Sequence, residues 1–171
     1  MTKRELMLLD WTRKVHQLEY AHYFESTMYS WIYTILSISI IAITSVIASS
    51  YTFPEISTED YNNLYLIFRQ EFFTAIFSAV AALFSAVLTF LRPNEKSEKH
   101  RKLGLEYEKI RHEFEKVYTY NFTETSIDFK ANKVKDRWDN IDTLYVLPWN
   151  YKKAKKKVKD WYPTPMSFIE K

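Results

Sequence analysis

Two stretches of twenty residues, 31–50 and 72–91, contain no charged side chain, although 26% of the chain is Asp, Glu, Lys or Arg. Twenty helical residues reach ~30 Å, the hydrocarbon thickness of a bilayer. A charge at mid-membrane costs roughly 2.5–3.5 kcal/mol on insertion scales, so spans exclude such residues. The pattern predicts two membrane-spanning helices. The alternative is a soluble helical hairpin, but soluble helices normally keep a polar face, and residues 35–48 offer only Ser and Thr as polar side chains.

The rest of the composition restricts the fold and the chemistry. The chain has one Gly, five Pro and no Cys, which is typical of an all-helical protein without disulfides or thiolate ligands. A single Gly excludes Gly-rich phosphate-binding loops and nucleophile elbows. Glu19 and His22 match half of the Glu-x-x-His pattern of di-iron bundles, but the second copy is missing. We expect a protein that is not an enzyme, with no catalytic residue, metal site or bound cofactor.

Charge is distributed unevenly around the two stretches. Residues 1–28 carry four basic and four acidic side chains, residues 92–171 carry nineteen and thirteen, and residues 51–71 carry one and four. Because Lys and Arg are retained on the cytoplasmic side of a membrane, we expect both termini to be cytoplasmic. The loop 51–71 is then extracytoplasmic.

Together these patterns predict an all-α membrane protein, a two-transmembrane helical hairpin with long amphipathic cytoplasmic helices at both termini. The predicted parts are a cytoplasmic amphipathic helix at 1–28, the transmembrane hairpin at 29–92, cytoplasmic helices at 93–147 and a basic tail at 148–171. Pro93 predicts a kink or break after the second span, because proline removes a backbone donor.

A heptad-like seam follows Pro93, in a helix expected over residues 94–118. Its apolar members are Leu103, Tyr107, Ile110, Phe114 and Val117. Seams of this kind pack helices against one another, and we expect this one to be an oligomerisation surface. A further cytoplasmic helix is indicated by Ile127, Val134, Trp138, Ile141 and Tyr145, with its end near Pro148.

Small and hydroxyl-bearing residues recur along each span. The hydroxyl members that we single out are Thr34, Ser37, Thr44, Thr74, Ser78, Ser85 and Thr89. Such a stripe either lines a pore made by several hairpins or lets helices pack closely in lipid, where small residues are the usual contact. Both interpretations stay open, and an oligomer can combine them.

Two histidines flank the spans at similar distances, His22 before the first and His100 after the second. If the helices run perpendicular to the membrane, both side chains lie at one cytoplasmic depth, each on the apolar seam of its helix, and we single out Tyr107 with them for coupling. They are candidates to join Glu19, Glu25 and Glu98 in a cluster that couples a cytoplasmic signal to the spans. The alternative is two histidines that only satisfy neighbouring carboxylates.

Six lysines are concentrated near the C-terminal end: Lys152, Lys153, Lys155, Lys156, Lys157 and Lys159. Each lysine near an anionic leaflet contributes roughly 1 kcal/mol, so this run is a candidate for lipid binding. Binding of a phosphate-rich ligand and a merely solvated tail are the alternatives.

The layout resembles the SLATT family of bacterial two-span effectors. The resemblance rests on Trp11 and His22 before the spans, on Glu98, His100, Arg101, Tyr107 and Arg111 after them, and on Arg137–Trp138. It implies a protein of the bacterial inner membrane that oligomerises and breaches that membrane in anti-phage defence. It also implies a trigger, either a nucleotide second messenger or a soluble defence-system protein, and no catalytic residues.

These observations predict a homo-oligomeric effector that forms or gates a pore in the lipid bilayer. The alternative is a membrane-anchored adaptor, in which the spans only localise the chain and the cytoplasmic helices recruit a soluble defence enzyme.

Overall fold

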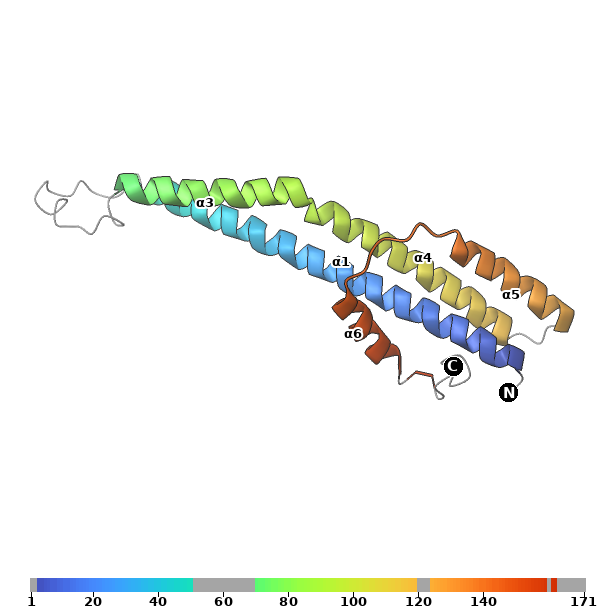
Figure 1. The fold of residues 1–171 in the computed structure, drawn as a ribbon. Helices are drawn as coiled ribbons and strands as arrows, with labels where there is room; N and C mark the ends of the chain where they lie inside the picture. The colour runs from blue at the N-terminus through green and yellow to red at the C-terminus, as the bar shows by residue number, and fades with distance from the viewer. Residues whose placement is uncertain (1–2, 51–69, 120–123, 160, 163–171) are drawn as a thin grey trace, which may run out of the picture. The chain divides into compact units, whose positions relative to one another are not determined.

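The computed structural model describes residues 3–50, 70–119, 124–159 and 161–162, and its regular structure in these ranges is entirely α-helical (Figure 1). The helices are α1 (Lys3–Ser50), α3 (Gln70–Leu91), α4 (Pro93–Thr119), α5 (Glu124–Asp139) and α6 (Pro148–Lys159). Contacts divide the chain into one unit of residues 1–28 and 96–171 and a second unit of residues 29–95. The expected loop at 51–71 lies outside the described residues except for its last two positions.

Helix α1 joins the predicted N-terminal amphipathic helix and the first apolar stretch into 48 continuous residues. Neither Gly nor Pro occurs in this range, so nothing in the backbone interrupts the hydrogen-bond ladder. At 1.5 Å per residue the helix is about 70 Å long. It ends at Ser50 and α3 ends at Leu91, which are the ends predicted for the two apolar stretches.

The helix break at Pro93 is confirmed. Arg92 has a φ of 44°, in the left-handed region, and its N–H donates to the carbonyl of Leu88 (3.1 Å). Pro93 then begins α4, where its missing N–H would have had no helical partner in any case. α4 confirms the long helix expected over residues 94–118.

The apolar positions of the first unit form one core between α1, α4 and α5. Its buried members are Leu8, Val15, Leu103, Tyr107, Ile110, Phe114, Val117, Ala131 and Val134. Phe114 lies at the centre, with ring centroids 5.9 Å from Trp11 and 6.5 Å from Trp138. The first unit therefore buries an aromatic cluster that draws one ring from each of three helices.

The expected end of the third cytoplasmic helix is wrong. α5 ends at Asp139, residues 141–147 are not helical, and the side chain of Tyr145 is exposed. Pro148 begins α6 and does not end α5, since proline is as well suited to the first turn of a helix as to the position after one. The segment predicted as a basic tail is thus a helix as far as Lys159, and residues 163–171 lie outside the described residues.

The second unit contains the apolar parts of the two helices that are long and apolar enough to cross a membrane. Of the most apolar eighteen-residue window in each, 0% is buried in the first and 6% in the second. Large side chains such as Ile38, Ile41 and Leu83 are more than half exposed. A core helix of a soluble protein would bury these side chains, so the exposure favours lipid as the surrounding medium.

Gly104 lets α1 and α4 approach closely, because a Cβ there would lie 3.0 Å from Cε1 of Tyr23. Gly104→Val is expected to lower the free energy of unfolding by about 1–3 kcal/mol, the usual cost of inserting methyl groups into a packed contact. Thermal unfolding in detergent measures this change. Leu105→Val, at an exposed neighbouring position, is the control, and equal stability of the two variants would contradict the tight contact.

Candidate functional site

A histidine pair connects α1 and α4 in the first unit. His22 Nδ1 lies 2.9 Å from His100 Nδ1, and both side chains are buried. The ring of Tyr107 stacks on His22 at 5.3 Å with an interplanar angle of 9°. The structure therefore brings together the three residues that the sequence analysis singled out for cytoplasmic coupling.

The geometry of the pair requires that its two nitrogens share one proton. A short Nδ1–Nδ1 contact is attractive only if one ring donates and the other accepts, so two imidazolium rings would repel each other here. Burial, together with the neighbouring His100, lowers the pKa of His22 from 6.5 to about 4. Burial also lowers the pKa of His100, with Glu25 opposing that shift and Lys96 reinforcing it. Both the shared proton and the lowered pKa values favour a neutral pair at pH 7.

Of the three carboxylates expected in this cluster, only Glu25 lies near the pair. Glu25 is 1% exposed, and its Oε1 accepts the backbone N–H of Leu147 (2.5 Å). Its Oε2 is buried with no hydrogen-bond partner among the described residues. Glu98 is instead paired with Arg101 (2.9 Å), and Glu19 with Arg111 (2.7 Å), so both were wrongly included.

Glu25 also positions α6, because Leu147 immediately precedes that helix. The carbonyl of Leu147 accepts the first helical hydrogen bond, from Tyr151 N–H at 3.1 Å. A carboxylate at this end complements the positive end of the helix dipole. The contact thus ties the start of α6 to the same turn of α1 that carries the histidine pair.

The lysine run lies on a helix that packs along α1 through Ala154 and Val158, both fully buried. The Nζ atoms of Lys153 and Lys157 lie over the rings of Phe24 and Tyr20, 4.4 and 4.2 Å from their centroids. All six lysines are exposed, but within the described residues the remaining four make no such ring contact. Those four exposed lysines are Lys152, Lys155, Lys156 and Lys159.

Contacts along α6 show its direction. The Asn150 amide donates to the sulfur of Met28 (3.9 Å) at one end, and the Tyr162 hydroxyl lies 3.2 Å from His16 Nδ1 just beyond the other. α6 therefore runs antiparallel to α1, so the lysines follow the axis of α1.

The structure corrects the assignment of the seam to oligomerisation. Leu103, Tyr107, Ile110, Phe114 and Val117 are each at most 8% exposed and belong to the core of the chain itself. A heptad pattern specifies a helix partner but not which chain supplies it. Here α1 and α5 of the same chain supply it.

The span hydroxyls bond mainly to their own helices. Five of the seven donate to a carbonyl three or four residues back: Thr34, Thr44, Thr74, Ser85 and Thr89. Ser37 is half-buried and Ser78 is exposed. Hydroxyls satisfied in this way are tolerated in lipid, at helix contacts and beside water, so pore lining and packing both remain compatible with the stripe.

Sequence reasoning missed a third buried histidine, His16. Its ring packs on Trp161 at 5.2 Å, and burial, with the Arg111 charge, lowers its pKa to about 4. Burial also raises the pKa of the Tyr162 hydroxyl that faces it to about 12. The available signal was the four-residue spacing of His16, Tyr20 and Phe24, an aromatic stripe on the face of α1 that α6 covers.

No group of three or more His, Cys, Asp or Glu side chains within the described ranges is arranged to hold a metal ion. Comparison with protein-family models, curated proteins and solved structures gives no match. The functional argument therefore depends on the residues described above.

Proposed function

We propose that the chain is a membrane effector whose two spans form a hairpin, and that several hairpins assemble to form or gate a pore. The observation that carries this proposal is the pair of apolar helices whose side chains are almost entirely unburied within one chain. Such surface is stable only against lipid or against other copies. Small and hydroxyl residues on both helices suit either close contact between copies or a water-filled path.

The proposed setting is the bacterial inner membrane, with both termini in the cytoplasm and a role in anti-phage defence. The excess of Lys and Arg outside the spans supports the orientation, and the SLATT-like layout supports the role. Assembly proceeds through the spans, because the seam residues are occupied inside the first unit. No catalytic group has a part in this mechanism.

Opening requires that a cytoplasmic signal reach the spans. The His22–His100 pair is well suited to transmit it, since it links α1 to α4 (2.9 Å), and each helix is continuous with, or directly follows, an apolar span. A shift of α1 against α4 would break this contact. Two arrangements that differ by a few kcal/mol are enough for a bistable gate. The proposed trigger is a nucleotide second messenger or a partner protein.

Induced expression in a bacterial host tests the proposal. A membrane-potential dye and growth curves should report depolarisation and arrest, either on expression alone or with a defence-system trigger. Intact potential under every condition, from a chain that is present in the membrane fraction, would contradict a pore.

Ser78→Leu combined with Ser85→Leu separates a pore from mere packing against lipid. If these hydroxyls face water, two leucines close the path, and depolarisation should fall at least tenfold. Ala79→Leu with Ala86→Leu is the matched control, because both alanines are exposed on the same helix with the same spacing. Equal loss of activity in both variants would indicate a general packing defect.

The second candidate is a membrane-anchored adaptor. Exposed aromatic side chains on the first unit favour it, among them Phe129, Tyr145 and Trp149, because aromatic residues are enriched in protein interfaces. For an adaptor, the serine variant should retain full function. Replacing the exposed aromatic residues should instead release the soluble partner from the membrane fraction.

A further inference from the structure

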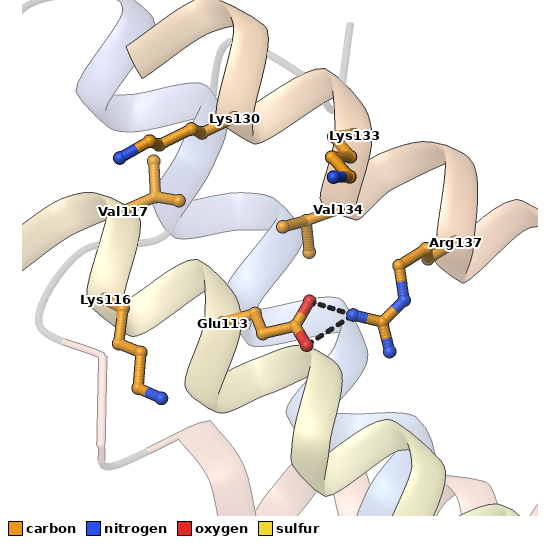
Figure 2. A pocket seen from close by; sticks show the side chains of 7 residues that line it. All are labelled: Glu113, Lys116, Val117, Lys130, Lys133, Val134 and Arg137. Carbon is orange, nitrogen blue, oxygen red and sulfur yellow. Dashed lines mark hydrogen bonds and ion pairs between the residues drawn. The ribbon is translucent and has the colours of Figure 1, made fainter. Parts of the chain in front are cut away.

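A shallow groove of about 370 Å³ lies between α4 and α5 of the first unit (Figure 2). Its apolar part is formed by Val117 and Val134, which are 6% and 7% exposed. Around these valines stand four cationic side chains and one carboxylate. The charged residues of this site lie on two helices, α4 and α5, and follow a different spacing in each. No single pattern in the sequence therefore predicts the site.

The charge balance of the groove is strongly positive. Arg137 Nη1 donates to both oxygens of Glu113, and this ion pair neutralises one cation (Figure 2). Lys116, Lys130 and Lys133 also line the groove. No ion pair of Lys116 or Lys133 is found among the described residues. A neighbouring hollow of about 440 Å³ on α4 mixes lysines with two glutamates and a histidine, so of these two hollows the groove between the helices is the more cationic.

We propose that this groove binds a small anion carrying two or more phosphates. Ammonium groups around a concave apolar surface focus positive potential and attract a multivalent anion. Among the described lining residues none is aromatic, and the recognition that we propose is through the phosphates. The ion pair with Glu113 holds Arg137 at the groove.

The ligand bridges α4 and α5 by contacting lysines from both helices. It therefore stabilises the α4–α5 contact beside the core residues Val117 and Val134. That this event triggers a pore rests on the proposed function, whereas the binding site itself does not.

Titration calorimetry of the full chain in nanodiscs of neutral phospholipid tests the site, with inorganic tripolyphosphate as the probe. Lys116→Gln combined with Lys133→Gln should weaken binding at least about tenfold, because each lost phosphate contact removes a salt-dependent term. The matched control is Lys99→Gln with Lys102→Gln, which removes the same charge from exposed positions of α4 outside the groove and should change affinity less than about twofold. Affinity for the unmodified chain should also fall as salt rises.

Nanodiscs that contain an anionic phospholipid distinguish the two sources of phosphate. If lipid headgroups fill the groove, the apparent affinity for tripolyphosphate drops there and recovers in neutral discs; unchanged affinity assigns the groove to a soluble ligand. Absence of binding in neutral discs, or equal loss in both double variants, overturns the proposal. Because this assay reads binding and not depolarisation, its failure is distinguishable from failure of the pore.

Discussion

Phe114→Ala is expected to lower the free energy of unfolding by about 3–5 kcal/mol, the range for removing a buried phenylalanine from a packed core. Phe114 is 0% exposed and contacts Trp11 on α1 and Trp138 on α5. Truncation leaves a cavity between three helices that a single rotamer change does not refill. Denaturant unfolding of the detergent-solubilised chain, followed by tryptophan fluorescence, measures the loss, because both neighbouring tryptophans report on this position.

Phe129→Ala is the matched control, since Phe129 is 73% exposed on α5 and should change stability by no more than about 0.5 kcal/mol. Comparing these two variants also tests whether the seam residues form a core within one chain. Destabilisation from an intrachain core is independent of protein concentration, whereas loss of a contact between copies becomes smaller as concentration rises. A concentration-dependent Phe114→Ala effect would return the seam to an oligomeric interface.

The parts of the fold that were predictable depend on local rules. Absence of charge over twenty residues marks both apolar helices, because no neighbouring element is needed to make a buried charge costly in lipid. Pro93 breaks the helix through its own ring and missing donor. The heptad spacing of α4 likewise predicts a helix with one apolar face, whatever covers that face.

The parts that were not predictable depend on which segments meet. The spacing of Phe114 and its apolar neighbours is the same whether α1 of the same chain or α4 of another copy covers them. Pro148 fits the end of one helix or the start of the next. In the structure it begins α6, where the N–H of Leu147 donates to Glu25. His22 and His100 were paired by equal distance from the spans, but Glu98 fits the same rule and instead bonds Arg101. Spacing along the chain therefore predicts how far from a span a residue lies, but not which face of its helix carries the side chain.

Acidification should destabilise the first unit through its buried histidines. His22 and His16 each have a pKa of about 4 in the folded chain against 6.5 ordinarily, so between these values the unfolded chain binds more protons. Stability from each group is therefore complete above pH 6.5 and is lost as pH falls toward 4. A difference of this size corresponds to about 3 kcal/mol per histidine. Protonation also places like charges on His22 and His100, whose nitrogens are 2.9 Å apart.

The slope of stability against pH isolates the His22 contribution from any packing change. His22→Gln cannot take up this proton, so between pH 6.5 and 4.5 its mean slope should be shallower by about 1 kcal/mol per pH unit. His112→Gln makes the same substitution at a side chain that is 52% exposed and is the control for the substitution itself. An unchanged slope in His22→Gln would mean that His22 carries a proton when folded. The neutral, single-proton geometry of the pair would then be wrong, and acid would no longer be expected to separate α1 from α4.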